Sequence, residues 1–404
     1  MTSLTHLRTR ITAVGGAIVL LLAAGVWIAM THASAQNTAD SNSAAKPGAS
    51  KSTSSVAPIS LTSVSPRRNA AGVSGARTIE IKFSEPLAAS SPLPTIRPRI
   101  AGTWHGAGTS ALKFVPAQGF GQLTHVTIKI PGGVRGVRST SGGLLPSTVK
   151  VHYETRAYSV RRLDQLLAQL GYLPLNWSAS SASSDPAAAD TAAQLAAAYS
   201  PPAGHFSWHS GFPSKLHEFW RGGSTSGLIL KGAIMAFEAD HGLGMDGVAG
   251  PQVWATLLSA VAAHRGNSHG YTYAIASEAN PETLTIWHDG HQVLHSLANT
   301  GIPASPTTIG TAPVYLRYYK QIMRGKNPDG TKYADLVYYV AYFRSGEAVH
   351  YFLRGSYGSP QSLGCVELPM SEAKQAWPYL TYGSLVTVER GSLTPSTSPT
   401  DPTT

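Results

Sequence analysis

The sequence predicts a multidomain, mainly β protein with an N-terminal membrane segment. Residues 11–30 form an uncharged, mostly apolar span, which predicts the membrane segment. Alternating apolar residues interrupted by glycine-rich turns fill residues 57–155 and 271–390, the pattern of two β-rich domains. Between them, apolar residues recur at helical spacing within residues 158–262, which predicts a small domain of three helices.

The composition agrees with several β-rich modules joined by flexible segments. A chain of 404 residues is long enough for two to four domains. Only 13% of the residues are charged, while 40 glycines and 27 prolines are present. The formal net charge of +10 would attract polyanions. Because an export signal is predicted, we expect an anionic cell envelope and no nucleic acid as the partner.

The N-terminal segment, residues 1–35, is predicted to be either a retained anchor or a cleaved signal peptide. Arg8 and Arg10 precede the apolar span, in agreement with a positive-inside orientation. Twenty helical residues would cover about 30 Å, the thickness of a bilayer core, which favours the anchor. Ala33-Ser34-Ala35 is nevertheless typical of a cleavage site. Either interpretation places the rest of the chain outside the cytoplasm, after a disordered linker at residues 36–56 that is rich in Ser, Ala and Thr.

Residues 57–155 are predicted to form a β-sandwich. Ile79, Ile81 and Phe83 alternate with polar residues, as half-buried strands do. The runs Phe83-Ser84-Glu85-Pro86-Leu87, Gly102-Thr103-Trp104 and Leu112-Lys113-Phe114-Val115-Pro116 resemble a bacterial Ig-like domain. Because no cluster of acids, histidines or nucleophiles occurs in this region, we expect a spacer, with polysaccharide binding as the alternative.

Residues 158–262 are predicted to hold three helices. The first carries leucines at helical spacing up to Leu170 and stops at Gly171, and the last begins at Pro251. The run Asp246-Gly247-Val248-Ala249-Gly250-Pro251, followed by Trp254, resembles a three-helix peptidoglycan-binding domain. That resemblance implies glycan strands as a partner.

An insertion at about residues 176–227 departs from that resemblance. Its first half is rich in Ser, Ala and Pro and is predicted to be disordered. Its second half is aromatic, and for it we expect additional core or packing against a neighbouring domain, with a glycan site as the alternative. The aromatic residues are Phe206, Trp208, Phe212, Phe219 and Trp220.

Residues 271–390 are predicted to be β-rich, followed by a loose tail at residues 391–404. Asp289-Gly290 favours a tight hairpin between two apolar runs. Residues 338–343 and 349–352 are predicted strands, and residues 372–379 a helix.

The chemistry is predicted near the single cysteine, which cannot form an internal disulfide. His350 lies in a predicted strand, a loop rich in Gly, Ser and Pro follows, and Gly364 precedes Cys365. A thiol with an ordinary pKa of about 8.5 needs a nearby base to attack an acyl carbon near neutral pH. Taken singly, each residue has a simpler interpretation, since lone cysteines are usually small buried hydrophobes and histidines in strands are usually structural.

The motif around Cys365 resembles the signature of the YkuD-type L,D-transpeptidase catalytic domain. It reads Tyr357-Gly358-x-Pro360-x-Ser362-x-Gly364-Cys365-Val366, with His350 upstream. The resemblance implies a cysteine nucleophile, a histidine that accepts and donates its proton, and an oxyanion held by the backbone at the Gly-Cys step. It also implies substrate contacts and requires no metal or cofactor. The residues matched to these roles are Cys365, His350, Gly364 and, for the substrate, Tyr357, Ser362 and Met323.

The resemblance implies a reaction on peptidoglycan stem peptides. The cysteine would attack the amide between the third and fourth residues of a tetrapeptide stem, expel D-alanine, and pass the acyl group to an amine on another stem. Transfer to a different amine, or hydrolysis, would use the same groups and stays open.

One position departs from the family pattern, since Leu363 stands where a histidine usually precedes the glycine. We expect a divergent but active enzyme, because nucleophile, base and loop all remain. The alternatives are a catalytically weak or inactive peptidoglycan-binding scaffold and an anchored adhesin.

Overall fold

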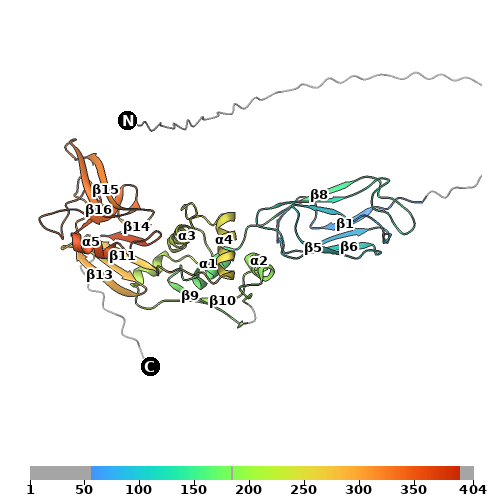
Figure 1. The fold of residues 1–404 in the computed structure, drawn as a ribbon, viewed down its shortest axis with the longest axis horizontal. Coiled ribbons are helices and arrows are strands. Elements are labelled where there is room, and N and C mark those ends of the chain that lie inside the picture. The colour runs from blue at the N-terminus through green and yellow to red at the C-terminus, as the bar shows by residue number, and fades with distance from the viewer. Residues whose placement is uncertain (1–55, 183–184, 392–404) are drawn as a thin grey trace, which may run out of the picture. The chain divides into compact units, whose positions relative to one another are not determined.

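The computed structural model describes residues 56–182 and 185–391 (Figure 1). The predicted membrane segment, most of the linker and most of the C-terminal tail therefore lie outside the described residues. Within the part of the chain that is described, no helix is both long and apolar enough to cross a membrane.

Residues 57–155 form a sandwich of two four-stranded sheets, as predicted. Residues that alternate in the sequence, such as Ile79, Ile81 and Ile128, are buried between the sheets. The first sheet has the order β1-β3-β6-β5, with β1 at Leu61–Ser65, β3 at Ile79–Phe83, β6 at Ala111–Pro116 and β5 at Gly102–His105. The second has the order β2-β8-β7-β4, with β2 at Ala70–Val73, β8 at Val149–Thr155, β7 at His125–Ile130 and β4 at Thr95–Arg97.

Three helices lie where the periodicity predicts them. They are α1 at Val160–Gln169, α3 at Leu228–Asp240 and α4 at Pro251–Ala262. Gly171 follows α1 with a φ of +78°, a left-handed conformation that ends the helix. Pro251 starts α4, where its missing N–H is not needed.

The prediction of disorder in the first half of the insertion was wrong for much of that half. Strand β9 at Leu175–Ala179 pairs with β10 at Gly204–Trp208, and α2 spans Thr191–Tyr199. The Asp190 side chain accepts the N–H of Ala193 and caps α2. The Tyr199 hydroxyl donates to the carbonyl of Phe120 in the sandwich, 3.0 Å away. Local composition does not reveal such a long-range partner.

The aromatic half of the insertion packs against the C-terminal domain, as we expected. It contains β10 and the short 3₁₀ helix η2 at Ser214–Phe219. The ring of Phe212 lies 5.7 Å from that of Tyr271, and the ring of Phe219 lies 6.4 Å from that of Tyr273. These contacts make the insertion part of a core.

Residues 271–390 contain two sheets and one helix (Figure 1). Asp289 and Gly290 both have positive φ, as the predicted hairpin requires. The five-stranded sheet, in the order β13-β12-β11-β19-β14, holds β13 at His291–Leu297, β12 at Thr283–His288, β11 at Thr272–Ser277, β19 at Leu385–Glu389 and β14 at Gly310–Pro313. The four-stranded sheet holds β15 at Leu316–Lys326, β16 at Lys332–Arg344, β17 at Glu347–Tyr351 and β18 at Val366–Leu368, and α5 spans Met370–Ala376.

The helices and the C-terminal domain share one hydrophobic core. Tyr271, Tyr273 and Leu385 of the five-stranded sheet belong to the same buried cluster as the apolar faces of α1, α3 and α4. The backbones also approach closely, because a Cβ added at Gly232 of α3 would overlap the carbonyl oxygen of Gly383. Small residues at this contact therefore set the distance between α3 and the domain.

Because of this contact, we expect Gly232→Ala to destabilise the fold, the opposite of the usual effect of this substitution in a helix. Alanine inside a helix is normally more stable than glycine by about 0.5–1 kcal/mol. Here the added methyl group would meet a backbone carbonyl, so we expect a net destabilisation of about 1–3 kcal/mol from overpacking. Calorimetric thermal unfolding measures it, with Gly244→Ala as the control because nothing lies near that position. An unchanged or raised unfolding temperature for Gly232→Ala would contradict the close contact.

Candidate active site

His350 and Cys365 lie on one face of the four-stranded sheet. Strands β17 and β18 are parallel, with Val349 opposite Val366 and His350 opposite Glu367. Cys365 directly precedes β18 and so lies level with the residue before Val349. Because side chains two residues apart share a face, Cys365 and His350 point to the same side of adjacent strands. Both line a pocket of about 490 Å³.

The imidazole of His350 is oriented by a main-chain carbonyl. Its Nδ1 lies 3.0 Å from the carbonyl oxygen of Tyr351. Since a carbonyl can only accept, Nδ1 carries a proton, and in the neutral ring Nε2 is an acceptor. His350 is buried, and burial lowers its pKa from the ordinary value. The ring is therefore neutral near pH 7 and able to take up a proton.

Cys365 is a free, half-buried cysteine. Its Sγ lies 3.7 Å from the carbonyl oxygen of Gly346. The protein packed around the sulfur raises the thiol pKa to about 12, and the carboxylates of Glu367 and Glu347 add to the effect. The ordinary pKa of about 8.5 therefore does not apply, and the resting pocket holds a neutral thiol and a neutral imidazole.

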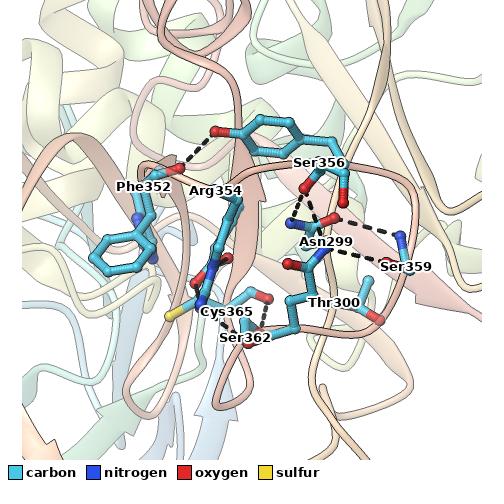
Figure 2. Close-up of polar contacts among 12 residues, drawn as sticks. Asn299, Thr300, Phe352, Arg354, Ser356, Ser359, Ser362 and Cys365 are labelled. Carbon is cyan, nitrogen blue, oxygen red and sulfur yellow. Dashed lines mark hydrogen bonds and ion pairs between the residues drawn. The ribbon is translucent and has the colours of Figure 1, made fainter.

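The Gly-Cys step is braced by Ser362 (Figure 2). The Ser362 hydroxyl donates to the carbonyl oxygen of Cys365 at 2.6 Å and accepts the N–H of Gly364 at 3.1 Å. Gly364 has a φ of +110°, which favours glycine. Its N–H is thus engaged within the loop, whereas the Cys365 N–H forms no hydrogen bond within residues 56–182 and 185–391.

Three residues matched to substrate contact lie in different surroundings. Met323 of β15 lines the pocket. Ser362 is fully buried and does not line it. The Tyr357 hydroxyl donates to the carbonyl oxygen of Phe352 at 2.6 Å, which closes the loop between β17 and β18. The structure brings Met323 to the pocket and places the other two in the supporting loop.

Asn299 fixes that loop to the domain core (Figure 2). Its backbone exchanges two hydrogen bonds of 2.9 Å with Glu367 of β18. Its side-chain oxygen accepts the N–H of Gly358 at 2.9 Å, and its amide donates to the carbonyl of Ser356 at 3.2 Å. A side chain with both donor and acceptor groups can therefore hold two points of the loop at once.

An ion pair that the sequence analysis did not anticipate forms one wall of the pocket. Arg354 donates two hydrogen bonds of 2.8 Å to the carboxylate of Glu367 and a third, of 2.9 Å, to the carbonyl of Gln361 (Figure 2). Its guanidinium also lies 4.6 Å from the centre of the Phe352 ring. The sequence alone does not show that Arg354 and Glu367 pair. The two residues come together because β18 lies beside β17 in the sheet.

Comparison with protein-family models finds two matches. Residues 271–388 match the L,D-transpeptidase catalytic domain, YkuD, and residues 55–155 match a bacterial Ig-like domain. The chain carries an L,D-transpeptidase catalytic domain. No curated protein matches the chain.

Solved structures of other L,D-transpeptidases resemble the chain at low identity. L,D-transpeptidase 3 from Mycobacterium tuberculosis is 13% identical, with 81% of this chain and 98% of that chain covered and a TM-score of 0.28. The transpeptidase LdtMt1 in complex with imipenem is 14% identical over the same shares, 81% and 98%, also with a TM-score of 0.28. The catalytic domain of an E. faecium L,D-transpeptidase is 25% identical over 30% of this chain and 100% of that domain, with a TM-score of 0.28.

The raised pKa of the Cys365 thiol predicts that this residue is alkylated slowly. At pH 8.5 we expect iodoacetamide to modify native Cys365 at least about a hundredfold more slowly than the urea-unfolded chain, in which the thiol titrates normally. The native rate should keep rising about tenfold per pH unit through pH 10, because the thiolate fraction grows up to the pKa of about 12. Intact-protein mass follows the single cysteine without ambiguity. A plateau below pH 9 would instead show a thiolate stored in the resting site.

Proposed function

We propose that the transpeptidase domain acts through Cys365 as nucleophile and His350 as base on peptidoglycan tetrapeptide stems, and that it forms 3–3 cross-links. The observation that carries the proposal is the shared sheet face, on which a half-buried thiol and an imidazole of fixed tautomer line one pocket. A neutral thiol and a neutral imidazole in one pocket favour transfer of the proton as the sulfur attacks.

In the proposed reaction, the Cys365 thiol gives its proton to Nε2 of His350 as sulfur attacks the carbonyl carbon between the third and fourth stem residues. In this proposal the N–H of Cys365, which forms no hydrogen bond within the described residues, donates to the oxyanion. The imidazolium then protonates the leaving D-alanine amine, and a thioester remains. An amine from another stem attacks the thioester, gives its proton to His350, and releases the thiol.

The rival function, an inactive peptidoglycan-binding scaffold, rests on Leu363. Its side chain lines the pocket, and its backbone carbonyl accepts a hydrogen bond of 3.1 Å from Ser305. Every residue has this backbone carbonyl, whatever its side chain. The hydrogen bond from Ser305 therefore supports the loop with leucine at this position. The placement of thiol and imidazole therefore favours an active enzyme.

Substitution of the two proposed catalytic residues tests the function. Cys365→Ala should abolish formation of cross-linked dimers and of the thioester from a purified disaccharide-tetrapeptide. His350→Gln should lower the rate about 10²–10⁴-fold, the usual contribution of a general base. Mass spectrometry of the products measures both, and it separates transfer from hydrolysis. His295→Gln is the matched control, since that histidine is exposed and Thr285 is its only side-chain hydrogen-bond partner among the residues that the structure describes. Full activity of Cys365→Ala would end the proposal.

We also propose that the chain works in the bacterial cell envelope, held by its N-terminal segment, and that the helical domain binds peptidoglycan. A cleft of about 370 Å³ lies between α3 and the start of β11. Tyr271 lines this cleft, and its hydroxyl is buried with no hydrogen-bond partner in the described part of the chain. Such a group favours a ligand that supplies the missing bond.

Retention on insoluble peptidoglycan tests this binding. The full chain with Cys365→Ala should sediment with peptidoglycan, and adding Tyr271→Phe should weaken its binding about fivefold, the effect of one hydrogen bond. Tyr273→Phe is the control, because its hydroxyl bonds Thr387 instead. An isolated helical fragment would be unsuitable, since its core includes residues of the five-stranded sheet. Equal retention of all three proteins would show that the cleft does not bind the wall.

A further inference from the structure

The β15–β16 hairpin has two chemically different faces. Met323, Asp335 and Val337 point to one side and line the catalytic pocket. Ile322 pairs with Leu336, and both point to the opposite side, because neighbours along a strand alternate. The alternation shifts at Tyr339, whose φ is +57°, so Tyr338 and Tyr339 both stay on the outward side.

The outward face exposes apolar and aromatic side chains. Tyr319 is 58% exposed, and Ile322 and Leu336 are each 50% exposed. The ring of Tyr319 packs edge-on to that of Tyr338, 6.3 Å away. At the base of the hairpin the ring of Tyr339 lies 6.2 Å from that of Trp377. Exposed apolar and aromatic side chains gathered on one face of a hairpin are a sign of an interaction surface.

The same face carries only positive charges. Lys320, Arg324, Lys326 and Lys332 occupy outward positions of the two strands, and all four are exposed. The one acid of these strands, Asp335, points into the catalytic pocket. A partner that complements this face must therefore be anionic and able to accept apolar side chains.

We propose that the outward face of the β15–β16 hairpin binds the surface of an anionic phospholipid membrane. Exposed cations attract the headgroups, while tyrosine and aliphatic side chains enter the boundary between headgroups and acyl chains. A hydrophilic anionic polymer would satisfy the cations but leave Ile322 and Leu336 in water. The membrane segment predicted at residues 11–30 would hold the chain close to such a surface.

This binding would also orient the enzyme. The catalytic pocket uses the inward face of the same two strands, so a hairpin lying on lipid would leave the pocket open to the side away from the membrane. The inference does not depend on the chemistry proposed for Cys365, and it is tested without measuring activity.

Hydroxyl-radical footprinting of the full chain in vesicles tests the surface. We expect Tyr319, Ile322 and Leu336 to be modified severalfold more slowly with about a quarter phosphatidylglycerol in the lipid than with phosphatidylcholine alone. The double substitution Lys320→Gln and Arg324→Gln should lower the ratio of membrane-bound to unbound hairpin about 30-fold, as expected for the loss of two interfacial cations. The matched control is Lys129→Gln with Lys150→Gln, an exposed cross-strand pair of the Ig-like sandwich with the same change in charge.

Further arms of the experiment separate lipid from other occupants. Ile322→Ser should reduce protection of Tyr319 and Leu336 while keeping every charge. Equal protection by soluble poly(glycerol phosphate) would overturn the proposal in favour of a wall polymer. Protection that grows with protein concentration without vesicles would overturn it in favour of a second copy. Equal modification rates of these residues in both kinds of vesicle would overturn the proposal that this face binds anionic lipid.

Discussion

The parallel pairing of β17 with β18 is the constraint on which the site depends. It places Cys365 one step before Val366 and level with the start of the segment that carries His350. A slip of one residue would turn the thiol to the opposite face of the sheet, away from the imidazole. Parallel neighbours require a crossing connection, and here it is an irregular loop that Asn299 and Ser362 hold at several points. The hydrogen bonds of the loop thus stabilise the register between β17 and β18, and they do not line the pocket for a substrate.

The pocket keeps the two proposed catalytic groups, the thiol of Cys365 and the imidazole of His350, uncharged. Burial disfavours both the thiolate and the imidazolium, so neither ion forms alone at low energetic cost. The nearby Glu367 would disfavour the thiolate further, yet Arg354 pairs with it and offsets part of that charge. A resting thiol is also less prone to oxidation than a thiolate, which suits the location proposed for this chain outside the reducing cytoplasm.

Patterns within a few residues predicted much of the fold. Alternation predicted the sandwich strands, Gly171 the end of α1, and Asp289-Gly290 the hairpin, because each depends on local backbone preference. Cys365, His350 and Met323, which the family resemblance matched to the site, line one pocket. The Arg354–Glu367 pair and the helix α2 escaped prediction, since both depend on partners distant in sequence. The supporting role of Ser362 and Tyr357 was missed for the same reason: a motif names residues without showing which way they point.

The core shared by the helices and the C-terminal domain limits how such a protein could evolve by recombination. Domains that are joined only by linkers can be exchanged as independent cassettes. Here a transplanted C-terminal domain would expose Tyr271, Tyr273 and Leu385, and a new neighbour would need small residues opposite Gly383. The helical domain and the transpeptidase domain are therefore expected to have been inherited together as one unit, with gene fusions falling on the sandwich side of α1.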